Sequence, residues 1–241
     1  MSSTDNLSHY FSGRINLLVV EDDGNLLSAL VEIFSVPCFN VTGASSIEEA
    51  RKAVARRDSI WHGWIVDMCL DGNDDAGATL IEEHRHFPFT VVYSGLQSME
   101  NAAHAIQKGA AAVIDKGSDS VDKLIREVCG LAPLAVLCKG TLSKNREILF
   151  LLKSQTVRGP AEWADTANMT LRQIEYISQT HTGMTPSMVD FFYYGLRYLL
   201  LSGFGMKGEL IHNREEESFY QNCILNLQKS MPSYQNILFQ R

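Results

Sequence analysis

The sequence contains no disulfide, zinc or membrane-span pattern. Its five cysteines, at positions 38, 69, 129, 138 and 223, are odd in number and form no CxxC pair. They indicate reduced thiols rather than a disulfide framework or a structural zinc site. The most apolar stretch, 191–206, contains Arg197 and is too short to span a bilayer. The first residues lack the charged start and apolar run of a signal peptide, so we expect a cytoplasmic protein with no membrane partner.

The net charge of −7 is distributed unevenly along the 241 residues. Residues 1–138 hold 19 acids against 10 Lys and Arg, residues 139–214 hold 9 bases against 6 acids, and residues 215–241 hold 3 acids against 2 bases. The length allows two domains of about 100–200 residues each. An acidic first part and a mildly basic second part predict two modules with different partners.

The first 130 residues alternate between strand-like and helix-like segments. Residues 15–20 form an apolar run rich in β-branched residues, and residues 25–34 carry apolar side chains at helical spacing. The alternation then predicts strands at 39–42, 61–66, 89–93 and 112–115, and helices at 46–56, 77–86, 98–108 and 118–130. Five β-α units predict an α/β fold with a doubly wound, five-stranded parallel sheet.

Polar residues follow four of the five predicted strands. They are Glu21, Asp22 and Asp23 after the first strand, Asp67 after the third, Ser94 after the fourth and Lys116 after the fifth. Any one of them alone is most simply a turn former, a helix cap or a solvated side chain. In an open parallel sheet, however, ligands bind beyond the carboxyl ends of the strands. The four positions together therefore predict one site.

These residue types suit phosphoryl transfer. Clustered carboxylates repel one another and favour a bound cation, and Mg²⁺ accepts carboxylate, carbonyl and water oxygens. Such an ion would polarise a phosphoryl group, and Asp67 would attack the phosphorus to form an acyl phosphate. Lys116 would pair with the phosphoryl oxygens, and Ser94 would donate a hydrogen bond to one of them.

Residues 14–131 resemble the flavodoxin-like receiver domain of bacterial two-component response regulators. The resemblance is carried by Leu-Val-Val-Glu21-Asp22-Asp23, Val66-Asp67, Tyr93-Ser94-Gly95 and Asp115-Lys116. It implies that Asp67 is the phosphoacceptor and that Ser94 and Lys116 contact the phosphoryl group, with Ser94 as the switch hydroxyl. The implied Mg²⁺ ligands are Glu21, Asp22, Asp67 and the backbone carbonyl of Cys69. The implied phosphodonor is a histidine kinase or phosphotransfer protein.

Three positions depart from the family pattern. The loop after Asp67 lacks the usual proline, and Gly117 follows the lysine where proline is common. Val113 stands where the family usually has an aromatic side chain that moves with the switch hydroxyl. The aromatic switch is therefore not carried over to this chain.

The second part predicts an all-α domain with a helix-turn-helix-like segment at 160–182. We expect an N-terminal tail at 1–13, a linker and helix at 132–154, and an output domain at 155–241. Within that domain, Pro160 opens a short helix, Thr170 caps a second helix to Thr180 that Gly183 closes, and Thr185-Pro186 opens a third helix to about Leu201. A tail helix after Asn213 would use Phe219, Ile224 and Leu227 for packing or dimerisation.

The stretch from Trp163-Ala-Asp-Thr-Ala-Asn-Met-Thr-Leu-Arg-Gln-Ile to Thr182-Gly-Met-Thr-Pro-Ser resembles one helix-turn-helix of the AraC-type transcription regulators. The resemblance implies that the second helix enters the major groove of DNA. Its implied DNA-contacting residues are Thr170, Arg172, Gln173, Tyr176 and Gln179. Only one copy of a motif that the family normally carries twice is present.

Three functions are compatible with these patterns. The first is a transcription factor that is phosphorylated on Asp67, dimerises and binds promoter DNA. The second keeps the receiver but makes the helical domain a protein-interaction or dimerisation output that binds no DNA. The third, a haloacid-dehalogenase-type phosphatase, requires an acid two residues after Asp67, where Cys69 stands and the nearest acid is Asp71. We therefore expect no enzymatic activity apart from self-catalysed transfer onto Asp67.

Overall fold

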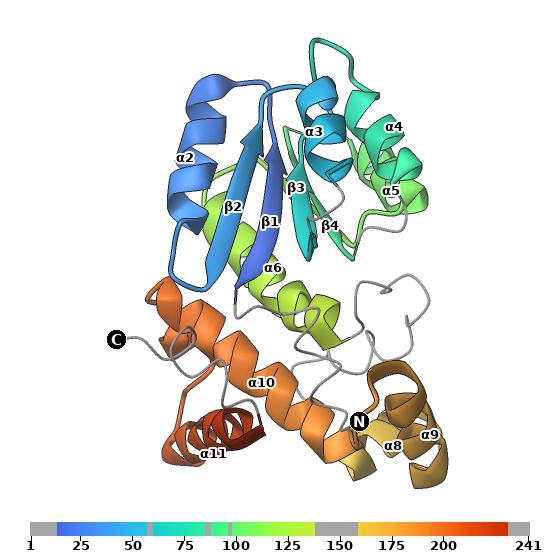
Figure 1. Ribbon diagram of the computed structural model, residues 1–241, viewed down its shortest axis with the longest axis vertical. Coiled ribbons are helices and arrows are strands. Elements are labelled where there is room, and N and C mark those ends of the chain that lie inside the picture. The colour runs from blue at the N-terminus through green and yellow to red at the C-terminus, as the bar shows by residue number, and fades with distance from the viewer. Residues whose placement is uncertain (1–13, 57–59, 85–87, 96–97, 138–158, 231–241) are drawn as a thin grey trace. The chain divides into compact units, whose positions relative to one another are not determined.

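The computed structural model describes residues 14–56, 60–84, 88–95, 98–137 and 159–230 (Figure 1). The chain divides into two compact units, one comprising Arg14–Val128 and the other beginning at Cys129. No helix within the described residues is both long enough and apolar enough to cross a membrane.

The first unit is a parallel sheet of five strands in the order β2-β1-β3-β4-β5. The strands are β1 (Ile15–Val20), β2 (Phe39–Ala44), β3 (Gly63–Val66), β4 (Thr90–Ser94) and β5 (Ala112–Asp115), and the helices are α2 (Gly24–Phe34), α3 (Ile47–Val54), α4 (Ala76–Glu83), α5 (Met99–Lys108) and α6 (Ser120–Leu137). This order is the flavodoxin-like doubly wound arrangement. The predicted fold class is therefore confirmed, and the observed strands lie within a few residues of the predicted ones.

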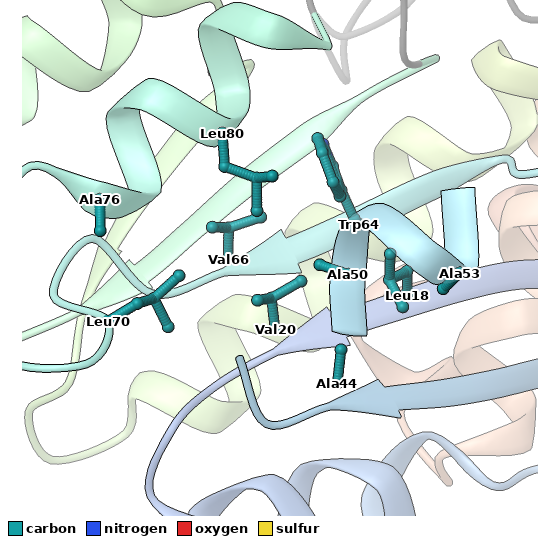
Figure 2. Packing of buried hydrophobic residues seen from close by; sticks show 10 residues of the cluster. All are labelled: Leu18, Val20, Ala44, Ala50, Ala53, Trp64, Val66, Leu70, Ala76 and Leu80. Atoms are coloured by element: carbon teal, nitrogen blue, oxygen red, sulfur yellow. The ribbon is translucent and has the colours of Figure 1, made fainter. Parts of the chain in front are cut away.

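One face of the sheet packs against α3 and α4 (Figure 2). Its buried cluster consists of Leu18, Val20, Ala44, Ala50, Ala53, Trp64, Val66, Leu70, Ala76 and Leu80. The helices contribute mostly alanines to this cluster, so large strand side chains such as Trp64 fill the space between the layers. The indole Nε1 of Trp64 donates a hydrogen bond to Oγ1 of Thr90, which satisfies its buried polar atom. Burial of each large apolar side chain contributes about 1.5–3 kcal/mol.

The opposite face of the sheet is covered by α2. Gly43 pairs with Val19 across β1 and β2, so both positions face the same side. A Cβ atom at Gly43 would lie 3.2 Å from side-chain atoms of Leu27 and of Val31 on α2. The absence of a side chain at Gly43 therefore lets α2 approach the sheet closely.

Helix α6 is longer than the sequence indicated. We expected a helix ending at residue 130 and a linker from residue 132, but α6 continues to Leu137 with Pro133 inside it. Proline removes one main-chain hydrogen bond from a helix interior. The residues around it, including Leu131, Leu134 and Leu137, are all buried, and this packing offsets the lost bond. The linker prediction is wrong for 132–137, and the helix predicted within 145–153 lies outside the described residues.

The described residues of the second unit are 129–137, at the end of α6, and 159–230, and the latter stretch is helical, as predicted. It contains α8 (Pro160–Ala167), α9 (Leu171–Thr182), α10 (Pro186–Gly203), the 3-10 turn η2 (Lys207–Glu209) and α11 (Arg214–Ser230). Thr170 caps α9 through a capping box with Gln173, and Thr185 caps α10. Asn168 and Gly183 end α8 and α9 in the left-handed conformation. The expected short helix, turn and second helix are therefore present.

The tail helix α11 packs along α10. Its buried stripe is Tyr220, Cys223 and Leu227, whereas Phe219 and Ile224 are only partly buried. The ring of Tyr220 stacks on Tyr198 at a centroid distance of 5.5 Å. Of the three residues expected on the apolar face, Leu227 is buried, whereas Tyr220 and Cys223 take the buried positions expected for Phe219 and Ile224. The face is used for packing within the unit.

Candidate functional site

Strand register brings the predicted site residues together at the carboxyl edge of the sheet. Val20 of β1 pairs with Val66 of β3, so Glu21 and Asp67 follow at the same level. Ser94 of β4 pairs with Asp115 of β5, and the N–H of Lys116 donates to the carbonyl of Ser94 at 3.1 Å. Parallel pairing alone therefore places these side chains side by side, as ligand sites in open parallel sheets require.

Asp67 is the centre of this cluster and is only 7% exposed. Its Oδ1 accepts hydrogen bonds from the hydroxyl of Ser94 at 2.5 Å and from the N–H of Cys69 at 3.2 Å. Its Oδ2 accepts from Nζ of Lys116 at 2.5 Å. Because charge-assisted bonds of this kind are short and directional, the carboxylate is held in one orientation.

Lys116 bridges two carboxylates. Its Nζ also lies 2.8 Å from Oε2 of Glu21. Burial lowers the pKa of Lys116, but its hydrogen bonds to Asp67 and Glu21 outweigh burial and leave the pKa above its ordinary value. Burial likewise raises the pKa of Glu21, and the hydrogen bond from Lys116 opposes that shift. The cation is therefore fully protonated at neutral pH and compensates two buried carboxylates.

Glu21, Asp22 and Asp67 could together hold a metal ion. One carboxylate oxygen of each lies within 4.8 Å of the others, and Asp22 is the exposed member of the three. An all-oxygen donor set of this kind fits a hard cation such as Mg²⁺. Cys69, expected to contribute a backbone carbonyl, is held beside Asp67 through its own N–H.

Asp23, the third acid after β1, has a different role. Its Oδ1 accepts from the N–H groups of Asn25 at 2.9 Å and Leu26 at 3.2 Å. This carboxylate therefore caps α2, as the simplest interpretation of an acid before a helix predicts.

The loop after Asp67 contains no proline, although the family that this segment resembles usually has one there. Leu70 and Asn73 exchange two main-chain hydrogen bonds across a two-residue turn. Asp71 and Gly72 both have positive φ, 55° and 74°, as a tight hairpin turn of this type requires. An Asp-Gly turn thus reverses the chain here.

Gly77 is a residue of the site that sequence reasoning missed. Its N–H donates to the carbonyl of Met68 at 2.9 Å, and a Cβ atom there would lie 2.1 Å from the carbonyl oxygen of Asp67. Only glycine lets the start of α4 approach the backbone of Asp67 this closely. A glycine in the first turn of a predicted helix was the available signal.

Tyr93 supports the site from the strand that carries Ser94. Its hydroxyl forms a buried hydrogen bond of 2.8 Å with Oγ of Ser120, at the start of α6. Nζ of Lys116 lies 5.8 Å from the centre of its ring. Val113, by contrast, packs against the apolar cluster around Met68 and Val92. The aromatic ring beside Lys116 therefore comes from β4, and β5 contributes none.

The five residues predicted to contact DNA are all exposed at the start or along the length of α9. The side chains of Thr170 and Gln173 are used in the capping box, and Nε2 of Gln179 donates to the carbonyl of Gly183 at 3.3 Å. Arg172 and Tyr176 remain as the outward-facing pair, and Tyr176 is 70% exposed.

Solved structures with a similar fold match the N-terminal half of the chain. No protein-family model and no curated protein matches the sequence. Three solved structures that match are the receiver domain of the Francisella response regulator 1452, a CheY-like receiver domain protein from Methanospirillum hungatei JF-1, and NtrX from Brucella abortus. Their identities are 21%, 23% and 26%, with TM-scores of 0.44, 0.44 and 0.45. The matches cover 49%, 50% and 55% of this chain and 97%, 96% and 30% of those chains.

Proposed function

We propose that this chain is a two-component response regulator that accepts a phosphoryl group on Asp67 from a histidine kinase or phosphotransfer protein. The observation that carries the proposal is the set of contacts on one buried carboxylate. Ser94 donates to one of its oxygens, Lys116 donates to the other, and two further acids lie within metal-binding reach. An aspartate with only a structural role would not require a hydroxyl, an ammonium group and two further carboxylates around it.

The contacts define what each residue does during transfer. An oxygen of Asp67 forms the bond to phosphorus while the bond from phosphorus to the donor nitrogen breaks, and that electron pair leaves with the donor imidazole. Ser94 and Lys116, which now bind the carboxylate, are then within reach of the phosphoryl oxygens. A Mg²⁺ ion held by Glu21, Asp22, Asp67 and the carbonyl of Cys69 would offset the negative charge gathered there.

Labelling of the full chain tests this assignment. Incubation with acetyl phosphate and Mg²⁺ should add one base-labile phosphoryl group, detected by intact-protein mass spectrometry. Asp67→Asn should abolish the addition. Asp71→Asn and Asp74→Asn, two exposed acids of the same loop, are the matched controls and should retain it. Continued labelling of the Asp67→Asn protein would sink the proposal.

The output we propose is DNA binding by α8 and α9 in a phosphorylation-dependent homodimer. The exposed pair Arg172 and Tyr176 on the second helix of a capped helix-turn-helix supports it. The first unit also carries an apolar stripe on α5, where Met99 is 90% exposed and Ala103 and Ile106 follow at helical spacing. A stripe of this kind suits self-association.

A second candidate output, a protein-interaction surface that binds no DNA, is favoured by charge. Residues 160–182 hold Glu162, Asp165 and Glu175 against Arg172 alone. Nucleic-acid affinity comes largely from neutralised phosphates, so an acidic face of this kind weakens it. Leu171 and Tyr176, both exposed on α9, suit a protein partner instead. Footprinting at low salt, described below, separates the two outputs.

A further inference from the structure

A cavity of about 360 Å³ opens beside the proposed phosphoacceptor. Its lining includes Cys69 from the loop after β3, Ser94 from the end of β4, and Asn101 and His104 from α5. Ser94 belongs to both sites, because its hydroxyl also donates to Oδ1 of Asp67. The cavity therefore borders, at Ser94, the carboxylate that we propose is phosphorylated.

A histidine–aspartate pair lines this cavity. Nε2 of His104 lies 2.9 Å from Oδ1 of Asp75, the residue that precedes α4. The backbone N–H of Asp75 in turn donates to Oδ1 of Asn73 at 3.0 Å, which holds the backbone of Asp75 in its loop. An ionised carboxylate only accepts hydrogen bonds, so Nε2 carries the proton, and in the neutral ring Nδ1 is the basic nitrogen. The imidazole is 41% exposed, so water reaches it.

We propose that His104 is the general base for hydrolysis of the acyl phosphate on Asp67, oriented by Asp75. This inference rests on the proposed function. A cavity water forms a bond to phosphorus through its oxygen as its proton passes to Nδ1 of His104. The bond from phosphorus to Asp67 breaks, and its electron pair returns to the carboxylate. Inorganic phosphate leaves, and the imidazolium then releases its proton to solvent.

Other polar groups of the cavity are less suited to this role. Cys69 and Asp74 share a side-chain hydrogen bond, and carboxylates are weaker bases than an imidazole. The pairing of His104 with Asp75 is the arrangement found in catalytic triads, where a carboxylate sets the tautomer of the histidine that acts as general base. The pair would therefore limit the lifetime of the phosphorylated state.

The test follows loss of the phosphoryl group from the full chain. The protein is phosphorylated with acetyl phosphate and Mg²⁺, the donor is removed by desalting, and intact-protein mass spectrometry follows the decay. His104→Ala and His104→Gln should slow the decay by roughly 100-fold, and Asp75→Asn should also slow it. His212→Gln, which replaces an exposed histidine of the other unit, should decay like the wild type.

Free imidazole distinguishes a base from a structural residue. It should accelerate decay of the His104→Ala protein, where the deleted side chain leaves room, but not of the His104→Gln protein. Wild-type decay rates in the His104 variants would overturn the inference, as would a slow His104→Ala protein that imidazole does not accelerate. A wild-type chain that takes up no phosphoryl group would instead defeat the proposed function, and this inference with it.

Discussion

The backbone N–H of Asp71 donates a hydrogen bond of 3.0 Å to Oδ2 of Asp22, 49 residues earlier in the chain. The turn after β3 therefore holds the exposed carboxylate of the acidic cluster. Glu21, its neighbour, is paired with Lys116, whereas no Lys or Arg of the described residues pairs with Asp22. Of the two acids, Asp22 is therefore the one whose charge is not already compensated by Lys116.

Asp22→Ala should act through the metal and leave the nucleophile intact. Removing a direct ligand should raise the Mg²⁺ concentration needed for half-maximal phosphorylation by about tenfold or more. Even mutation of a residue that only hydrogen-bonds to a metal ligand lowers metal affinity by about tenfold or more. The measurement is the rate of labelling by acetyl phosphate across a Mg²⁺ titration. Asp23→Ser is the matched control, because serine still caps α2 and the neighbouring charge is removed. Equal rates for Asp22→Ala and wild type at limiting Mg²⁺ would show that Asp22 is no ligand.

Gly77→Ala should disturb both stability and phosphorylation. The new Cβ would lie 2.1 Å from the carbonyl oxygen of Asp67, so either α4 or the loop after β3 must move. Overpacking of this kind costs about 1–3 kcal/mol of unfolding free energy, and the displaced loop should slow labelling of Asp67. Urea unfolding and acetyl phosphate labelling measure the two effects. Gly24→Ala, at a position with no atom within 4 Å of the added Cβ, should leave both near the wild-type values.

Asp190 should make the helical unit less stable as the pH rises. It is buried on α10, and burial raises its pKa from 3.8 to about 7, against the opposing hydrogen bond from the N–H of Gly159 at 2.6 Å. The unfolded chain loses this proton near pH 4, whereas the folded chain keeps it until about pH 7. Its contribution to stability is therefore complete below pH 4 and is lost progressively as the pH rises to about 7.

Asp190→Asn removes the titration and tests that sign. Each unit of pKa difference corresponds to about 1.4 kcal/mol, so the variant should gain a few kcal/mol of unfolding free energy over the wild type at pH 8 relative to pH 4. Urea unfolding followed by circular dichroism at the two pH values gives the difference, and other titrating groups cancel in the comparison. A constant difference between the two proteins across this range would mean that Asp190 ionises normally.

The residues at the carboxyl edge of the sheet were predictable because each candidate site residue comes just after an apolar strand. Asp67 comes after Trp64-Ile-Val and Lys116 after Ala112-Val-Ile-Asp. The parallel register of the strands then brings the two side chains to the same edge of the sheet. The helix caps were predictable for a similar reason, since Thr170, Gly183 and Thr185 form hydrogen bonds to groups only three or four residues away in the sequence. Short-range sequence features, namely the spacing of apolar residues and the helix caps, were thus sufficient to predict most of the fold.

Features that depend on contacts distant in sequence were not predictable. Gly77 is required only because α4 starts against the backbone of Asp67, and His104 meets Asp75 across 29 residues. Helix α6 runs through Pro133 because burial of its neighbours outweighs the proline's local preference. In each case the feature depends on tertiary packing, and the residue pattern within a single helix or strand does not predict it.

DNA binding should require a dimer. The described helical residues 159–230 hold 8 acids against 5 Lys and Arg, and Arg172 is the only Lys or Arg on α9. A single copy therefore neutralises few phosphates and should bind weakly. Two tethered copies add their contacts at a high effective local concentration. We expect phosphorylation of Asp67 to promote the dimer, and the dimer to bind paired half-sites about one helical turn, or a multiple of it, apart.

Sedimentation with and without acetyl phosphate, run beside footprinting on promoter fragments at low salt, tests this expectation. Arg172→Ala should weaken specific binding by about 1–3 kcal/mol, as loss of one good base contact does, while phosphorylation and dimerisation stay intact. Lys207→Ala is the matched control, because it removes an exposed base of the same unit that lies outside α8 and α9. Phosphorylated dimers that protect no DNA at low salt would rule out the transcription-factor output. The exposed Leu171 and Tyr176 would then mark the surface where a protein partner binds.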